Sequence, residues 1–174
     1  DALASDPDDL HSLIRLADIQ ALQQDNTGEL LTLRQAVNAA PEALEPKLRF
    51  ARSAILNDKA AEAVAVLREA RERHGDDPRV YQLLAEGFLA MGQLDSARAA
   101  SDRLSGIYPR DPEALQLAAR VATAQGDHAA AFQALGTALE VTADPALHGS
   151  LAENLLRQGK LEEATAELSA LPPE

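Results

Sequence analysis

Apolar and polar residues alternate at helical spacing through the middle of the chain. Between residues 78 and 111, a first apolar stripe recurs at i, i+3, i+4 and i+7 and consists of Tyr81, Leu84, Ala85 and Phe88. After a short polar break, a second stripe consists of Leu94, Ala97, Leu104 and Ile107. This pattern predicts two amphipathic helices joined by a turn. Neither helix can bury its stripe alone, so the unit needs copies of itself to pack against.

The same unit recurs along the chain. Five pairs are spaced 34, 34, 34 and 33 residues apart: Leu16-Ala17, Phe50-Ala51, Leu84-Ala85, Ala118-Ala119 and Leu151-Ala152. Twelve residues after each pair, Ala fills four of five places: Glu29, Ala63, Ala97, Ala131 and Ala164. The expected core of each second helix consists of Leu33, Leu67, Ser101, Leu135 and Leu168, then Ala36, Ala70, Leu104, Ala138 and Leu171. The repetition predicts an all-α fold of stacked helix-turn-helix units.

Helix starts are marked by Asp-Pro, since Asp is a good N-cap and Pro is tolerated at the first helical position. The dipeptides are Asp6-Pro7, Asp77-Pro78, Asp111-Pro112 and Asp144-Pro145. We expect helices at about 7–23, 28–39, 44–56, 60–73, 78–91, 94–106, 112–125, 128–141, 145–158 and 161–171. The turns within the helix pairs hold Gln24, Asp58, Gly92, Gly126 and Gly159. Gly favours the positive φ on which many helices end.

We expect one repeat array over residues 1–174, with repeats at about 10–43, 44–77, 78–111, 112–144 and 145–174. Because the chain begins at Asp1 without Met, we expect a fragment of a longer protein. The last helix carries, as its stripe toward the fifth repeat, Leu161, Ala164, Leu168 and Leu171. Its other side is short of charge, as expected of a surface that another helix covers. We therefore expect further chain, or self-association through this C-terminal helix.

Composition narrows the classes of function. The formal net charge is −12 with a pI near 4.7, so phosphate backbones would be repelled and we expect no nucleic-acid partner. There is no Cys, which excludes disulfides, thiol catalysis and Cys-based zinc sites. No apolar run approaches the roughly 18 residues of a membrane span. We expect no direct membrane insertion by this segment.

The sequence offers no candidate for catalysis, a cofactor or a metal. The four histidines lie in different repeats without a ligand partner at i+3 or i+4: His11, His74, His128 and His148. The acidic pairs Asp76-Asp77 and Glu162-Glu163 are explained by helix capping and by the helix dipole. Dinucleotide, Walker, nucleophile-elbow and zinc-protease motifs are absent from the sequence. We therefore expect no enzyme and no cofactor.

The pattern resembles the tetratricopeptide repeat family, whose 34-residue units carry a small residue at position 8, Gly near 15, Ala at 20 and 27, and Pro at 32. In the central unit these positions hold Ala85, Gly92, Ala97, Leu104 and Pro109. Departures exist, because the position-4 Trp of the family is absent and Glu29 replaces Ala at position 20 of the first repeat. The resemblance implies a right-handed α-solenoid of about five repeats.

The resemblance also implies a protein–protein interaction scaffold. Its ligand, a peptide or protein segment, would lie in a concave groove lined by positions 2, 5, 9, 12 and 13 of each first helix. Our candidate groove residues are Arg52, Glu86, Gln116, Arg120 and Glu153. The alternative is a structural spacer within a longer array, with no groove ligand of its own.

Position 9 alternates in sign along the repeats: Asp18, Arg52, Glu86, Arg120 and Glu153. One interpretation is a ladder of salt bridges between neighbouring repeats, each exposed pair contributing less than about 1 kcal/mol. The other is a recognition stripe for an extended peptide that carries both charges. The Lys and Asn with which some members clamp the carboxyl terminus of chaperones are not present at positions 5 and 9. A chaperone tail is therefore not the expected ligand.

A narrower resemblance concerns the segments LRQGKLEEA at 156–164 and GDHAAAF at 126–132. They are similar to bacterial envelope proteins with tetratricopeptide repeats, including lipoproteins associated with exopolysaccharide secretion and the PEP-CTERM sorting system. This resemblance implies a setting in the bacterial periplasm or outer membrane.

Overall fold

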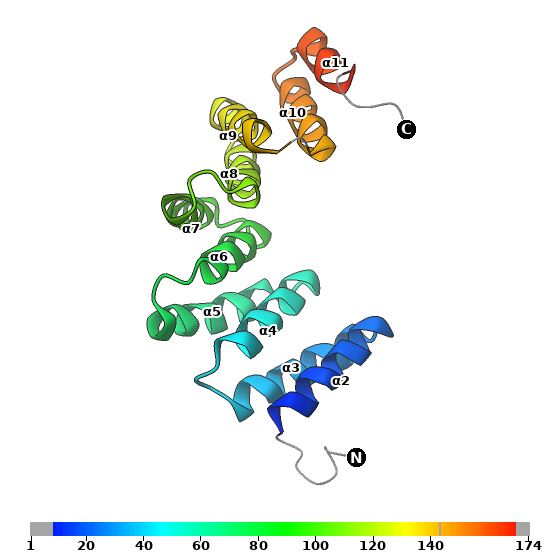
Figure 1. Cartoon of the computed structure of the whole chain (residues 1–174), viewed down its shortest axis with the longest axis vertical. Coiled ribbons are helices and arrows are strands. Elements are labelled where there is room, and N and C mark those ends of the chain that lie inside the picture. Colours follow the sequence, from blue (N-terminus) through cyan, green and yellow to red (C-terminus); the bar gives the residue numbers. More distant parts are fainter. Residues whose placement is uncertain (1–8, 143, 170–174) are drawn as a thin grey trace. The chain divides into compact units, whose positions relative to one another are not determined.

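The computed structural model describes residues 9–142 and 144–169, and in these it contains ten α-helices and no strand (Figure 1). The chain divides into two compact units, residues 1–91 and residues 92–174. Unit 1 holds α2 (Leu10–Leu22), α3 (Asn26–Ala39), α4 (Leu44–Leu56), α5 (Ala60–His74) and α6 (Pro78–Ala90). Unit 2 holds α7 (Leu94–Ile107), α8 (Pro112–Ala124), α9 (His128–Val141), α10 (Pro145–Arg157) and α11 (Leu161–Ser169).

The predicted fold class, all-α with repeated helix-turn-helix pairs, is confirmed. The expected start of the first helix, residue 7, is wrong, because α2 begins at Leu10. Asp9 has extended backbone and caps the helix by accepting a hydrogen bond from the Ser12 amide at 2.9 Å. Asp6-Pro7 lies outside the described residues. The single array over residues 1–174 stays a prediction.

The Asp-Pro starts of the later first helices are confirmed. In α6, α8 and α10, Pro occupies the first turn, and the preceding Asp accepts a backbone hydrogen bond of 2.9–3.0 Å. These caps satisfy amides that a helix start leaves without an intrahelical partner. The sequence of each start therefore sets where the first helix of the pair begins.

The core of unit 1 lies between α2, α3, α4, α5 and α6. The small residues of the repeat series are buried here: Ala17, Ala51, Ala63 and Ala85 have exposed fractions of 0–2%. The α5 and α6 helices approach closely, since a Cβ added at Gly87 would lie 2.9 Å from Cγ2 of Val64. Small side chains thus allow the close packing that the repeat requires.

The core of unit 2 runs from α7 to α11 through consecutive packed helices. Ala119, Leu135, Ala138 and Ala152 are buried in it, as the repeat series predicts. The predicted stripe of the last helix is wrong in part. Of the helix residues described, Ala164 is buried, whereas the exposed fractions of Leu161 and Leu168 are 66% and 48%. Leu171 lies outside the described residues.

The turns within the helix pairs share one backbone conformation. Gly92, Gly126 and Gly159 have φ of 68°, 78° and 76°, and Gln24 and Asp58 adopt φ of 59° at the equivalent places. Residues with a Cβ are strained at positive φ. The first two repeats therefore keep the turn geometry without the residue that favours it.

Candidate functional site

A groove of about 430 Å³ lies on unit 1, between the first helices α2, α4 and α6, with α3 contributing to its wall. We call it the unit 1 groove. It is lined by Ala17, Asp18, Ala21, Glu29, Leu33, Glu45, Leu48, Arg49, Arg52, Ser53, Leu56, Arg79, Gln82 and Leu83. Eight of these residues are at the repeat positions expected to face a groove: Asp18, Ala21, Glu45, Leu48, Arg52, Leu56, Arg79 and Gln82.

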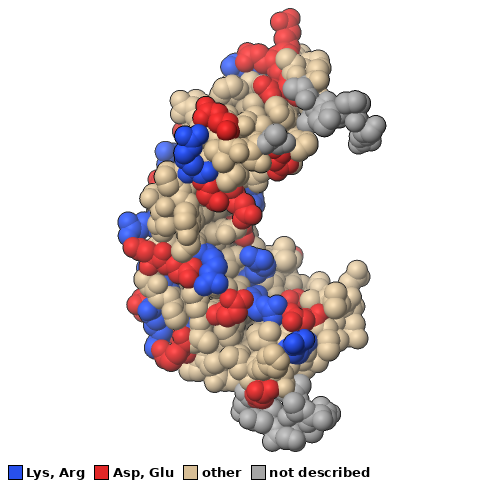
Figure 2. Space-filling model, viewed as in Figure 1, with Lys and Arg blue, Asp and Glu red and all other residues tan. Residues whose placement is uncertain are grey.

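Two ion pairs within the groove join first helices of successive repeats. Asp18 Oδ1 on α2 lies 2.7 Å from Arg49 Nη2 on α4, and Glu45 Oε2 on α4 lies 3.3 Å from Arg79 Nη1 on α6. Figure 2 shows acidic and basic side chains interspersed over the visible face of this unit. Pairing between repeats therefore exists, but it uses positions other than those predicted.

The predicted position-9 ladder is wrong where the structure describes it within one unit. Asp18 contacts Arg49, at position 6 of the next repeat, and not Arg52. In unit 2, Glu153 Oε1 lies 2.7 Å from Arg157 Nη2 on its own helix, and no ion pair joins Glu153 to Arg120 in the described residues. Among the described groove residues, the equal positions that pair between repeats are therefore Glu45 and Arg79, at position 2, and not the residues of position 9.

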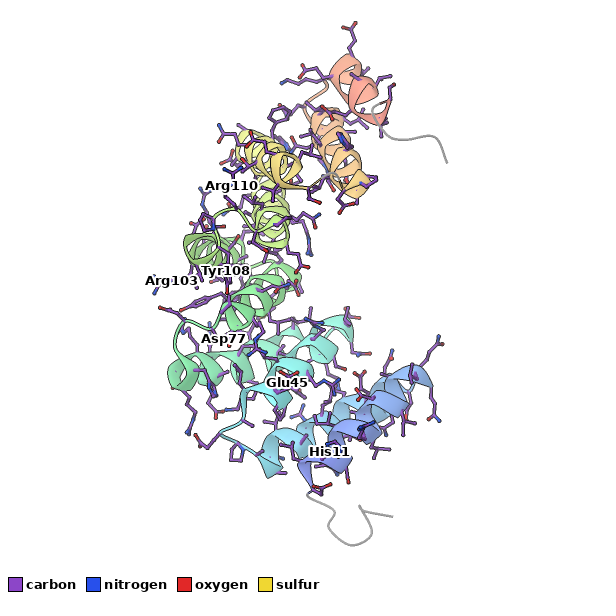
Figure 3. The ribbon with its side chains drawn as sticks, viewed as in Figure 1. His11, Glu45, Asp77, Arg103, Tyr108 and Arg110 are labelled. Atoms are coloured by element: carbon purple, nitrogen blue, oxygen red, sulfur yellow. The ribbon has the colours of Figure 1, made fainter. Side chains whose placement is uncertain are left out.

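Arg79 links the groove to the start of α6. Its guanidinium lies 2.9 Å from Asp77 Oδ2 as well as contacting Glu45; Figure 3 labels both carboxylates. The side-chain hydrogen bond from Arg79 holds the pKa of Asp77 below its ordinary value, although partial burial opposes this shift. Arg79 is therefore committed to two carboxylates, one of which caps its own helix.

Two charged side chains of the groove have no ionic partner among the described residues. Glu29 accepts a hydrogen bond from Ser53 Oγ at 3.0 Å, and no carboxylate of the described residues lies within ion-pair distance of the Arg52 guanidinium. Arg49 contributes a further unmet donor, because its Nη1 is buried without a hydrogen-bond partner in the described part of the chain. The groove thus contains hydrogen-bond donors, on Arg49 and Arg52, that lack an acceptor among the described residues.

Apolar side chains complete the groove. Leu33, Leu48 and Leu83 form buried parts of its wall, and Leu56 is 78% exposed at its edge. Leu22, at the repeat position equivalent to Leu56, is 86% exposed on α2. Of these two exposed leucines, Leu56 lines the hollow, and an exposed apolar side chain at a hollow favours an interaction surface.

The five candidate groove residues have different places in the structure. Arg52 lines the unit 1 groove, whereas Glu86 is half-buried on α6 and is not among the lining residues. Gln116 and Arg120 on α8 and Glu153 on α10 belong to unit 2, where Gln116 is half-buried and the other two are exposed. Of the five, Arg52 is therefore the residue that the described groove contains.

Sequence reasoning missed three polar groups of the groove: Glu29, Arg49 and Ser53. A signal existed for Glu29, since it replaces the Ala that fills position 20 in the other four repeats. The bulkier, charged side chain enters the groove wall because it lies where α3 meets the first helices. Arg49 and Ser53 carry no comparable signal in the repeat pattern.

A smaller cavity of about 90 Å³ lies in unit 2 between α7, α8 and α9. Ser101 lines it, and its Oγ is buried without a partner in the described part of the chain.

Within residues 9–142 and 144–169, no group of three or more metal-ligating side chains is placed to hold an ion. No helix in this same portion is both long and apolar enough to cross a membrane.

Comparison with protein families gives one result across most of the chain. Residues 30–87, 54–121 and 122–174 each match the sequence profile of the family described as Tetratricopeptide repeat. Together these segments cover well over half of the chain. A comparison with curated proteins finds no match.

Solved structures with similar folds are distant in sequence. PilW, described as a widely conserved type IV pilus biogenesis factor, is 20% identical over 98% of this chain and 81% of its own, with a TM-score of 0.83. TTC0263 of Thermus thermophilus, described as a thermophilic TPR protein, is also 20% identical, over 91% and 87%, with a TM-score of 0.77. MamA is 15% identical over 92% and 88%, with a TM-score of 0.74. At these identities the likeness shows the fold.

Proposed function

The chain belongs to the tetratricopeptide repeat family, and we propose that it is a non-enzymatic scaffold that holds a segment of a partner protein in the unit 1 groove. Repeats of this family and its structural neighbours support a role in protein–protein interaction. The observation that carries the proposal is the groove itself, in which polar groups without a partner among the described residues lie beside the exposed Leu56. A surface that served only as a spacer would have no need of either.

The four candidate groove residues other than Arg52 stay part of the proposed binding surface. Glu86, Gln116, Arg120 and Glu153 lie on α6, α8 and α10, the first helices of later repeats. We propose that these side chains, each on the first helix of its own repeat, also contact partner segments. Their exposed or half-buried state is compatible with such contact.

The setting proposed is a bacterial envelope assembly, as in exopolysaccharide secretion. The sequence resemblance described above favours it, and type IV pilus biogenesis is the role printed for PilW, one of the structural neighbours. We also keep self-association through α11 in the proposal, because Leu161 and Leu168 are exposed there. Fractionation of the native cells, with the protein followed by antibody, tests the setting.

Site-specific photo-crosslinking in the native cells tests groove binding. A benzoylphenylalanine replaces Ala21, which lines the groove, and in a matched variant replaces Glu72, which is exposed on α5 outside it. A protein crosslinked from position 21 and not from position 72 supports the proposal. If the two positions give the same products, or position 21 gives none, the spacer alternative is favoured instead.

A further inference from the structure

The charged side chains of the unit 1 groove divide into those with partners and those without. Three are acidic and three are basic: Asp18, Glu29, Glu45, Arg49, Arg52 and Arg79. Asp18 pairs with Arg49, and Glu45 pairs with Arg79. Glu29 accepts from a hydroxyl, whereas Arg52 has no ionic partner among the described residues. The charged group of the groove that most lacks a partner within the described part of the chain is therefore a hydrogen-bond donor, the Arg52 guanidinium.

Arg49 supplies a second donor without an acceptor in the described part of the chain. It lies three residues from Arg52 on α4, so the two guanidinium groups share one face of the helix. Its Nη1 is buried without an acceptor among the described residues, and leaving a buried donor unmet is costly. Its pair with Asp18 is partly exposed, with side-chain exposed fractions of 35% and 47%, and such pairs rearrange at little cost. A carboxylate on Arg52 would therefore lie on the same face of α4 as a second guanidinium.

The surroundings of Arg52 are aliphatic. Leu48 and Leu56 lie four residues before and after it, so all three share the groove face of α4. Toward α2 and α3 the wall contains Ala21 and Leu33, and toward α6 it contains Leu83. A ligand group on Arg52 thus has apolar surface on either side.

We infer that the unit 1 groove selects an extended internal segment in which one acidic side chain, bound by Arg52, has aliphatic residues two positions before and after it. Alternate residues of an extended chain face the same side and lie about 6.7 Å apart. Packed helix axes lie about 8–10 Å apart. With the acid over α4, its i−2 and i+2 neighbours fall toward the apolar walls at α2 and α6. This inference rests on the proposed function and specifies its ligand.

The carboxylate is assigned to a side chain and not to a chain terminus. Arg52 is on the middle of the three first helices, and lining residues continue onto both α2 and α6. A segment that ended over Arg52 would leave one half of the groove uncovered. Nucleic acid is a poor alternative source of anions, because the net charge of the chain is −12.

Selection from a displayed library of random nine-residue internal segments tests the inference on the whole chain. The wild type should enrich Asp or Glu at one position with Leu, Ile or Val at i−2 and i+2. The Arg52→Gln variant should lose the acidic preference and keep the aliphatic one. Because Arg52 is exposed and has no ionic partner in the described residues, we expect its thermal unfolding to match the wild type. Arg71→Gln is the control that should select as the wild type does, because Arg71 is exposed on α5 and does not line the groove.

Synthetic peptides then measure the contribution of the acid. Replacing the selected Glu by Gln should weaken binding to the wild type about tenfold, and binding to Arg52→Gln less than about twofold. Enrichment of Lys or Arg, enrichment only in a second library with free carboxyl termini, or bound peptides without an acidic preference would each overturn the inference while leaving groove binding intact. If no segment binds in a way that Ala21→Trp blocks, the proposed function fails as well.

Discussion

Asp18 and Arg49 join the first helices of two successive repeats, with Oδ1 and Nη2 2.7 Å apart. The two residues occupy positions 9 and 6 of their repeats, so the contact is displaced by nearly one helical turn from a pairing of equal positions. This displacement leaves Arg52, the position-9 partner that the sequence suggests, without a carboxylate among the described residues. The same contact therefore steadies unit 1 and keeps a guanidinium available for a ligand.

A double-mutant cycle should detect this contact. We expect the coupling free energy between Asp18→Ala and Arg49→Ala to be below about 1 kcal/mol, because the pair is partly exposed, and to fall at high salt. Urea unfolding at low and high ionic strength measures it. The matched cycle with Asp18 and Arg52 should show no coupling. Equal coupling in both cycles would contradict the assigned pairing.

Acid should weaken the contact between α4 and α5. The Lys47 side chain is buried, and its Nζ donates to Glu69 Oε1 at 2.8 Å. This hydrogen bond lowers the pKa of Glu69 from its ordinary value of 4.5. Since the folded pKa is depressed, the contribution to stability is complete above about pH 4.5 and is lost as pH falls through the folded pKa.

Urea unfolding between pH 3 and 6 checks this expectation, with these bounds set roughly around the ordinary carboxyl pKa. Glu69→Gln should unfold with a smaller dependence of the free energy on pH than the wild type. Glu72→Gln is the control, because Glu72 is exposed on the same helix. The expectation fails if both variants keep the pH dependence of the wild type.

Enlarging a small core residue should destabilise unit 1. Ala85 has an exposed fraction of 0% on α6, which packs against α4 and α5. We expect Ala85→Leu to lower the free energy of unfolding by about 1–3 kcal/mol through overpacking. Ala90→Leu is the control, because Ala90 is exposed on the same helix. A melting temperature unchanged by Ala85→Leu would show that the site accommodates the larger side chain.

The turn of the first repeat should accept Gly with a gain in stability. Gln24 has φ of 59°, which strains a residue with a Cβ. After allowing for the greater chain entropy of Gly, Gln24→Gly should raise the free energy of unfolding by about 0.5–1 kcal/mol. Thermal unfolding measures the change.

The reverse substitution is the control for this backbone effect. Gly126 has φ of 78°, and a Cβ there would meet nothing within 4 Å. Gly126→Ala should therefore lose about 1 kcal/mol through backbone strain alone. If Gln24→Gly destabilises the protein, its side chain contributes contacts that outweigh the strain.

The sequence predicts most of the helices, because period and capping are local properties. The second helix of the second repeat, for example, ends at His74 against an expected 73, and the Asp-Pro starts are confirmed. Burial of the repeat series follows from the same period. The exposed Leu161 and Leu168 depart from it, because Ala164 is the described residue of α11 that is buried in the core to which α10 contributes.

The site is less accessible to sequence reasoning. Repeat positions identify eight of the fourteen residues that line the groove, and Arg52 is among the eight. Which of them pair does not follow from the period alone, because Glu45 and Arg79 lie one period apart whereas Asp18 pairs with Arg49, three residues short of a period. Departures from the repeat pattern are a second source of prediction. Glu29 replaces the Ala of position 20, and it lines the groove.

Methyl NMR with a selected acidic–aliphatic peptide locates the binding site on the chain. We expect the methyl resonances of Leu48, Leu56 and Leu83, which line the unit 1 groove, to shift on titration. The exposed Leu161 and Leu168 on α11 should not move. Shifts confined to α11, or saturable binding with no change at the groove leucines, would contradict the claim that this groove is the binding site.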